Sequence, residues 1–314
     1  MAANKELVDD DVPIDSSQAA LNVTKILRES LKLPFENGKL TVSIVLLVLL
    51  PYSILVLIHN LVIVPIIQKL EDQEPPDGLA DDQKHLKAFL VFEAVFFLAF
   101  SLVSLFGIIV TIYGSAAIYA KNKSVSFKEL FSKIRATWKR AMITWIYISI
   151  YTVVYTLVSV VWIVAFVLVI KTGSTVTWFF LLGCLAAILY LYLAVVWTLS
   201  MVISVLEEGC YGIKAIQKAR DLIRGREIQG FGIMLSVVLL TCPISVLYYL
   251  NALGDDQVMA RLVLGFFVTV PFCFAKFFTY LVYTVFYYEY KKSHGERAEE
   301  LELGGCGYGL VPVK

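Results

Sequence analysis

The sequence predicts an all-α protein, a polytopic transmembrane helical bundle of six spans with two amphipathic interfacial helices on its cytoplasmic side. Apolar residues make up 59% of the 314 residues and charged residues only 17%, whereas soluble domains carry about 25% charged residues. Six apolar stretches are each long enough for a bilayer core of about 30 Å, which needs roughly 20 helical residues. Lys and Arg gather in alternate gaps between these stretches. A large soluble helical protein is therefore a poor explanation of this chain.

The predicted organisation is one membrane domain between two polar tails. The N-terminal tail covers residues 1–39, the membrane domain 40–290 and the C-terminal tail 291–314. The six predicted spans are 41–67, 88–119, 142–170, 175–206, 231–250 and 258–288. Several are longer than a bilayer requires, so tilted helices or helix ends that project into the interface are expected.

The distribution of positive charge predicts the orientation. The two tails and the second and fourth loops hold 21 of the 27 Lys and Arg residues, and the remaining loops hold five. Cytoplasmic loops are enriched in Lys and Arg, so both termini are expected in the cytoplasm. Spans without a cleaved signal indicate the endoplasmic reticulum or a later membrane of the secretory pathway, rather than the membrane of an organelle outside that pathway.

The second loop has the pattern of an amphipathic helix over residues 126–140. Ser126 and Glu129 have the spacing of a capping box, and Phe127, Ile134 and Trp138 belong to an apolar stripe at helical spacing. The basic residues of this segment are Lys128, Lys133, Arg135, Lys139 and Arg140. Such a helix lies in the interface with its cations near anionic headgroups. Alternatively, it is a connector whose charges only fix the topology.

The fourth loop repeats this design. Ile213, Ile216 and Ile223 recur at helical spacing and Gly225 marks a helix end. The basic residues here are Lys214, Lys218, Arg220, Arg224 and Arg226. A shift of 86 positions aligns the two loops, which suggests a parallel duplication of spans two and three in spans four and five. The same interfacial requirement could also produce both patterns independently.

Some of these residues suggest a family. The runs Val196–Glu208, Tyr211–Ile216 and Leu222–Arg226, together with Arg28–Pro34, resemble motifs of an uncharacterised family of six-span plant membrane proteins. More distantly, the glutamate at a span end, the basic helix and the Arg-Gly-Arg motif are similar to the membrane domain of some bacterial glycerophosphodiester phosphodiesterases. The resemblance implies a plant origin and a six-span fold. It transfers no catalytic residue, because catalysis in the bacterial proteins belongs to a separate soluble domain that this chain lacks.

Ionisable groups inside the spans are the main candidates for a functional site, since burying a charge in lipid is costly. His59 and Glu93 each lie about 10 to 12 Å from the outer ends of their predicted spans, so they could meet. Such a pair could relay a proton or bind a cation, or it could join two helices beside Asn60.

Lys276 is predicted in the inner half of the last span. There it either extends to the inner surface or pairs with Glu207 or Glu208 at the end of the fourth span. Together with His59, Asn60 and Glu93, these residues complete the set of intramembrane polar candidates.

No nucleotide-binding, metal-binding or nucleophile motif of a soluble enzyme occurs in the sequence. We therefore expect no cofactor and no metal, and a non-enzymatic integral membrane protein that organises a membrane or a protein partner. The expected partners are the lipid bilayer, anionic phospholipids and a further membrane protein, whereas the basic loops are too short and too close to the membrane to suggest nucleic acid. A transporter or lipid-translocating protein is the alternative, and a membrane-embedded lipid enzyme is the second alternative. A water-accessible cavity at His59, Glu93 or Lys276 would favour transport.

Overall fold

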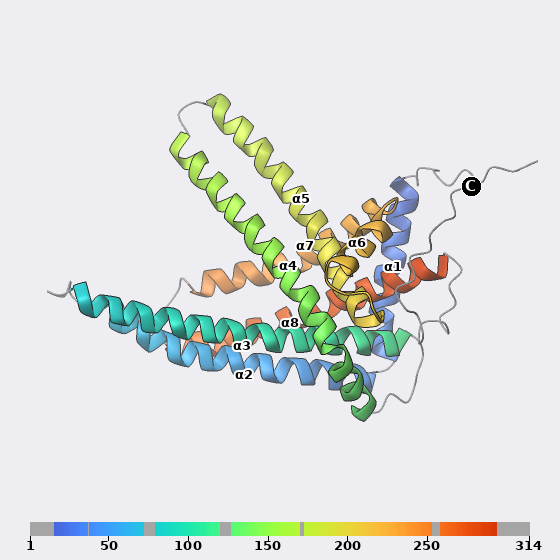
Figure 1. The fold of residues 1–314 in the computed structure, drawn as a ribbon, viewed down its shortest axis with the longest axis horizontal. Helices are drawn as coiled ribbons and strands as arrows, with labels where there is room; N and C mark the ends of the chain where they lie inside the picture. The colour runs from blue at the N-terminus through green and yellow to red at the C-terminus, as the bar shows by residue number, and fades with distance from the viewer. Residues whose placement is uncertain are drawn as a thin grey trace, which may run out of the picture.

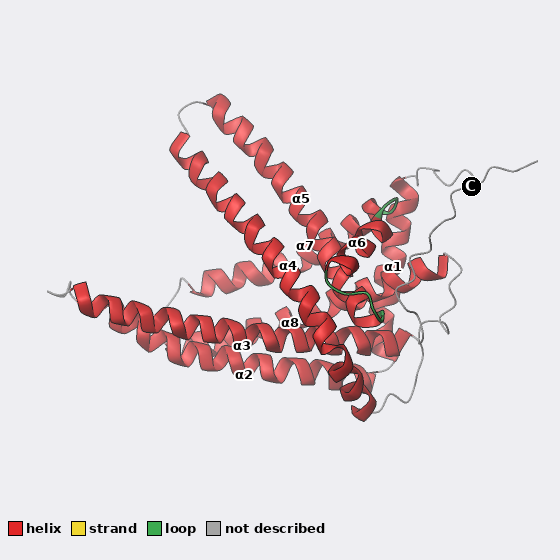
Figure 2. Ribbon diagram, viewed as in Figure 1, coloured by secondary structure: helices red, strands yellow, loops and turns green. Residues whose placement is uncertain are grey.

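The computed structural model describes residues 16–36, 38–71, 79–119, 127–169, 173–252 and 258–293. In these residues the chain forms helices and no strand (Figure 2). The helices are α1 (Ser16–Glu36), α2 (Gly38–Glu71), α3 (Leu79–Tyr119), α4 (Phe127–Val169), α5 (Gly173–Leu206), α6 (Ile213–Ile223), α7 (Glu227–Ala252) and α8 (Val258–Ser293).

Six of these helices, α2, α3, α4, α5, α7 and α8, are long and apolar enough to cross a membrane. Their apolar segments are Thr41–His59, Phe89–Tyr119, Phe131–Phe166, Thr177–Leu206, Glu227–Ile244 and Thr269–Lys292. The all-α fold with six candidate spans is thereby confirmed. It also follows from the physics of a bilayer, where a helix satisfies every backbone hydrogen bond within its own segment.

The helices form two arms that meet at one end (Figure 1). The α4–α5 hairpin diverges from α2 and α3, whereas α8 packs against α2, α3 and α7. Helices α1 and α6, the start of α4 and the ends of α5 and α8 gather at the meeting point of the arms, which we call the basic end. Most side chains of α4 from 150 to 164 and of α5 from 177 to 190 are exposed. Exposed apolar side chains on long helices suit a lipid environment.

The core lies near the basic end. Its largest fully buried side chains include Tyr283 and Phe286 of α8, and Leu199 and Ile203 of α5. Helices α2 and α3 approach closely beside it at Gly114, where a Cβ atom would clash with the Ile44 side chain. Small residues permit such close packing between membrane helices. The buried core therefore joins the helices at the basic end, and the two arms diverge beyond it.

Two elements differ from the sequence-based prediction. Residues 16–36 of the expected polar tail form α1, whose buried Val23, Ile26 and Leu33 face the core beside α7 and α8. The segment expected as a separate interfacial helix at 126–140 is the first part of α4 and continues into the span. Its junction, Lys139-Arg140-Ala141-Met142, consists of good helix formers without Gly or Pro, so nothing in the sequence ends the helix there.

Candidate functional site

A buried carboxylate lies at the centre of the basic end. Glu207 directly follows α5 and is only 4% exposed. Lys218 of α6 donates a hydrogen bond of 2.7 Å to its Oε2 atom, and the hydroxyl of Tyr287 of α8 donates one of 2.5 Å to its Oε1 atom. The Lys291 Nζ atom lies 3.4 Å from the same Oε1 atom. One side chain thus connects the end of α5 with α6 and α8.

The charges around Glu207 keep it ionised. Burial alone would raise the pKa of its carboxyl group, but the hydrogen bonds from Lys218 and Tyr287 and the charges of Lys218 and Lys291 outweigh burial and lower the pKa. A buried charge with matched partners is retained, whereas one left without partners is strongly destabilising. This cluster therefore resembles a structural ion-pair site more closely than a proton-transfer site.

The backbone at Glu207 extends the cluster to α3 and α4. Arg140 of α4 donates to the Glu207 carbonyl oxygen at 3.1 Å and to the Thr137 hydroxyl at 3.3 Å. The Tyr113 hydroxyl of α3 lies 2.5 Å from the Thr137 hydroxyl and donates to the Val205 carbonyl oxygen at 3.1 Å. These contacts connect five helices. We refer to Glu207 with Arg140, Lys218, Tyr287 and Lys291 as the Glu207 node.

The turn into α6 is fixed by a glycine. Gly212 has a φ of 62°, and a Cβ atom there would lie 3.2 Å from the Tyr147 ring. Its N–H donates to the Thr144 hydroxyl at 2.8 Å, and that hydroxyl donates to the Arg140 carbonyl oxygen at 3.1 Å. Only glycine adopts this backbone conformation without strain. The turn thereby places Lys218 of α6 against Glu207.

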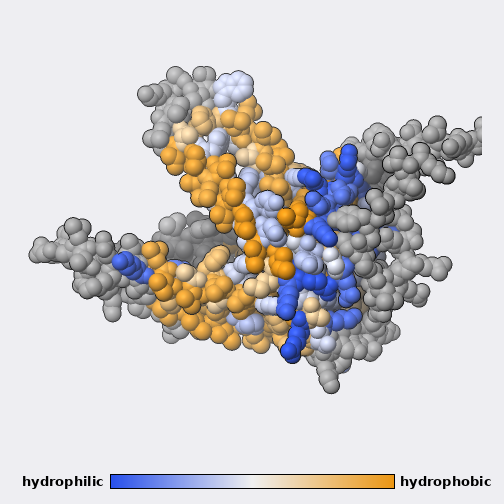
Figure 3. Space-filling view, in the orientation of Figure 1, coloured by the Kyte–Doolittle hydropathy of each residue, from blue (hydrophilic) through white to orange (hydrophobic). Residues whose placement is uncertain are grey.

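The ten predicted headgroup contacts divide into two groups. Three are half-buried and contact the protein: Arg140 and Lys218 belong to the Glu207 node, and Arg226 lies 5.3 Å from the Tyr290 ring centroid. Six are exposed, namely Lys133, Arg135, Lys139, Lys214, Arg220 and Arg224. The Lys128 side chain lies outside the described residues. Figure 3 shows hydrophilic side chains gathered at the basic end and apolar side chains along both arms.

The structure brings His59 and Glu93 together. The His59 Nε2 atom of α2 lies 3.1 Å from the Glu93 Oε1 atom of α3, and the His59 ring lies 4.0 Å from the Phe96 ring centroid. The Asn60 side chain lies outside the described residues. Within the described ranges, no group of three His, Cys, Asp or Glu residues could hold a metal ion. The contact joins α2 to α3 away from the basic end.

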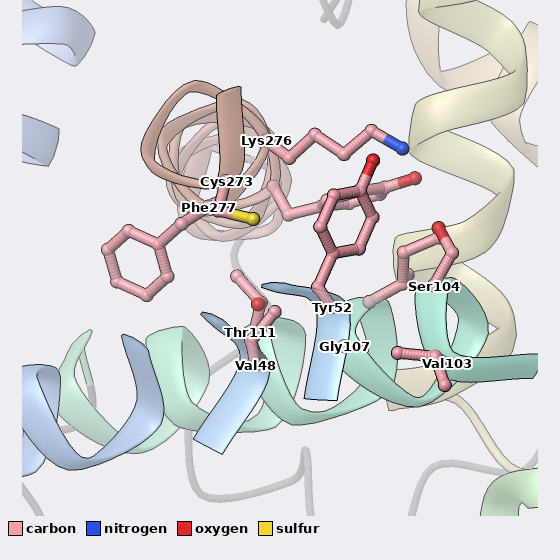
Figure 4. Close-up of a pocket in the computed structure, with 11 residues that line it drawn as sticks. Val48, Tyr52, Val103, Ser104, Gly107, Thr111, Cys273, Lys276 and Phe277 are labelled. Carbon is pink, nitrogen blue, oxygen red and sulfur yellow. The ribbon is translucent and has the colours of Figure 1, made fainter. Parts of the chain in front are cut away.

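Lys276 of α8 lines a small cavity between α2, α3 and α8 with a volume of about 30 Å³. Tyr52, Ser104 and Thr111 contribute hydroxyl groups to the lining, and Figure 4 shows the hydroxyls of Tyr52 and Ser104 on the side of the Lys276 amine. The amine lies 5.2 Å from the Phe272 ring centroid, a distance at which a cation is attracted to an aromatic face. The space admits a few water molecules at most.

The expected pairing of Lys276 with Glu207 or Glu208 is wrong. Glu207 binds Lys218 and Lys291 instead, and Glu208 is exposed. Lys276 is eleven residues from Tyr287 along α8, about 16 Å at the helical rise. The predicted place of Lys276 in the inner half of the last span, from where its side chain could extend to the inner surface, stays a prediction.

Sequence reasoning missed Tyr113, Tyr287 and Lys291 as members of this region. Tyr287 and Lys291 belong to a tyrosine-rich helix end, and because tyrosines are common at a membrane interface, this pattern does not single them out. One sequence signal could have indicated this region. Glu207 directly follows an apolar span, and the last span ends on the same predicted side of the membrane in tyrosines and lysines that could pair with it.

Comparison with known proteins gives a family and no further relative. No curated protein and no solved structure matches the chain, and its likeness to plant six-span proteins and to the bacterial membrane domain stays a prediction. The match is to the model of a domain of unknown function, DUF8558, and it runs over residues 15–305. Since these residues include every described helix, the whole membrane bundle from α1 to α8 is the DUF8558 domain, and the chain belongs to that family.

Proposed function

We propose that this chain is a non-enzymatic integral membrane protein that binds anionic phospholipids at its basic end and so organises the surrounding bilayer. In this proposal the basic end faces the cytoplasm, in the endoplasmic reticulum or a later membrane of the secretory pathway, because Lys and Arg mark the cytoplasmic side. The plant origin that the resemblance implies is part of the same proposal.

The six exposed cations of the basic end carry the proposal. They are Lys133, Arg135, Lys139, Lys214, Arg220 and Arg224, and none of them pairs with a carboxylate of the described residues. The half-buried Arg140 and Lys218 differ, because they stabilise the Glu207 node. A basic residue near an anionic membrane surface contributes about 1 kcal/mol to binding. Six such residues beside apolar spans favour anionic headgroups strongly.

The test compares lipid selection by two variants in nanodiscs of mixed phosphatidylcholine and phosphatidylserine. A variant with all six exposed cations replaced by Gln is expected to lose the enrichment of phosphatidylserine around the protein, by about tenfold or more if each cation contributes about 1 kcal/mol. The control is Lys87→Gln, an exposed lysine near the start of α3 at the opposite end. Unchanged enrichment in the six-residue variant would refute the proposal.

A transporter or lipid-translocating protein is the second candidate, and two observations favour it. Lys276 lines a cavity near the middle of the spans, and His59 contacts Glu93 on two of the same helices. Polar groups at two depths could form steps of a path. Flux of a solute or lipid across proteoliposomes that Glu93→Gln and Lys276→Met both abolish would favour this candidate. Nothing in the described residues favours a lipid enzyme.

A further inference from the structure

An apolar groove lies on the flank of the bundle beside the basic start of α4. Its volume is about 420 Å³, and apolar side chains of α2 and α3, with Leu50 and Leu102 among them, form most of its lining. Trp138 of α4 closes one side. Leu50 is 57% exposed and Leu102 is 38% exposed. The groove is thus open to the lipid that surrounds the spans.

The groove begins close to the level of the Glu207 node. Trp138 follows Thr137, whose hydroxyl accepts a hydrogen bond from Arg140 of the node and lies beside the Tyr113 hydroxyl. Phe106 also lines the groove and lies seven residues from Tyr113, about 10 Å along α3 toward the middle of the spans. The groove therefore runs from the polar boundary into the apolar region. A ligand of this place has a polar end at the boundary and an apolar body.

Two exposed cations lie close to Trp138 along α4. Arg135 lies one helical turn before Trp138 on the same face, and Lys139 follows Trp138 directly. Phe131 holds this part of α4 against α3, with its ring 6.3 Å from the Phe106 ring. Two cations over a membrane boundary attract a phosphate group, and they disfavour a headgroup that carries its own cation.

We propose that this groove holds one acyl chain of an anionic phospholipid, whose phosphate binds Arg135 and Lys139. A groove of about 420 Å³ lined mostly by apolar side chains suits the apolar body of one acyl chain. The inference rests on the proposed function and makes it more specific. Of the six exposed cations, Arg135 and Lys139 bind one lipid at a defined site. The other four attract anionic headgroups without binding a particular lipid molecule.

The experiment counts phospholipids retained by the full chain in native mass spectrometry, after purification in mild detergent with phosphatidylglycerol or phosphatidylcholine added. One phosphatidylglycerol per chain is expected. Arg135→Gln removes a charged hydrogen bond and is expected to lower its retention about tenfold. Leu50→Trp fills the groove and is also expected to lower the retention of phosphatidylglycerol. Leu102→Trp replaces it if the first variant does not fold. One matched control is Arg224→Gln, directly after α6, and the other is Val161→Trp on α4, where Val161 is 68% exposed.

The outcomes separate the groove from the basic surface. Retention in Arg135→Gln and Leu50→Trp at the level of their controls would overturn the groove, even while the six-residue variant loses phosphatidylserine enrichment and upholds the proposed function. Equal retention of phosphatidylcholine and phosphatidylglycerol would also overturn it. Loss of the retained lipid in both groove variants, with enrichment unchanged in the six-residue variant, would refute the proposed function and leave the groove standing.

Discussion

The basic end and the α4–α5 arm are held together by different physics. At the basic end, hydrogen bonds and ion pairs to Glu207 and its backbone connect the end of α5 with α4, α6 and α8, and Tyr113 of α3 adds a hydrogen bond to the Val205 carbonyl oxygen, all around a buried core. Along the arm, contacts run mainly between two neighbouring helices. Among them are the Trp162 and Phe179 rings, 5.6 Å apart, and a 2.8 Å hydrogen bond from Tyr155 to the Ala186 carbonyl oxygen.

This difference indicates which region is stabilised mainly by contacts within the protein and which region requires surrounding lipid. The basic end encloses charges and must satisfy each of them with protein groups. The arm exposes apolar side chains that water would not tolerate but lipid does. We therefore expect substitutions at the basic end to change the stability of the whole bundle, and substitutions along the arm to have small effects. The predictions below test this contrast in order of expected effect.

Glu207→Gln is expected to have the largest effect on stability. The substitution keeps the shape but removes the charge between Lys218 and Lys291, which leaves two lysines without their shared anion. Breaking a buried ion pair from one side typically costs about 3 kcal/mol or more. Thermal and denaturant unfolding in detergent micelles measure this loss.

The matched control for that substitution is the next residue. Glu208 is exposed, so Glu208→Gln is expected to change the free energy of unfolding by no more than about 0.5 kcal/mol. Equal effects of the two substitutions would contradict the central role of the Glu207 node and remove the contrast between the two regions.

The pH dependence of stability tests the same site without mutation. The pKa of the Glu207 carboxyl is lowered in the folded state from its ordinary value of 4.5. Its ionised form therefore contributes fully to the free energy of unfolding above pH 4.5, and this contribution is lost as the pH falls from there through the lowered pKa. Unfolding curves of the parent chain and of Glu207→Gln between pH 3 and 7 are expected to converge at the acidic end. Parallel curves would show that Glu207 does not carry this dependence.

The same contrast explains which parts of the molecule could be predicted from the sequence. The six spans follow from hydropathy, because a bilayer requires about 20 apolar residues for each crossing. The approach of His59 to Glu93 could be anticipated from equal distances to the ends of two consecutive spans. Both features depend on residues that are close along the chain or joined by one loop.

The Glu207 node could not be predicted in this way. Glu207 and Tyr287 are 80 positions apart and belong to helices that no short loop connects. The partners of Glu207 could not be identified either, because Lys218 of α6 and Lys291 at the end of α8 reach it from separate helices. Helix α1 was missed because its apolar side chains are too few for a span, although they suffice to cover the core.

Lys276→Met is expected to stabilise the bundle by about 1 to 2 kcal/mol. No carboxylate of the described residues pairs with this lysine, and replacing a charge in the apolar interior by a group of similar size removes its desolvation cost. Unfolding measurements compare it with Lys87→Met, which alters an exposed lysine and should change little. Destabilisation by Lys276→Met would mean that the cation has a partner that the cavity admits, and would favour a binding role for the cavity.

Glu93→Gln is expected to have the smallest effect. An amide oxygen can still accept a hydrogen bond from His59, and interhelical hydrogen bonds in membranes contribute about 0.6 kcal/mol on average. Under the proposed function this variant unfolds within about 0.6 kcal/mol of the parent chain, and its proteoliposomes show the same solute flux. Phe97→Ala is a suitable control, since its side chain is 68% exposed on the same helix. If Glu93→Gln abolished a flux that Phe97→Ala retained, the His59–Glu93 contact would be part of a transport path, and the region away from the basic end would carry the function.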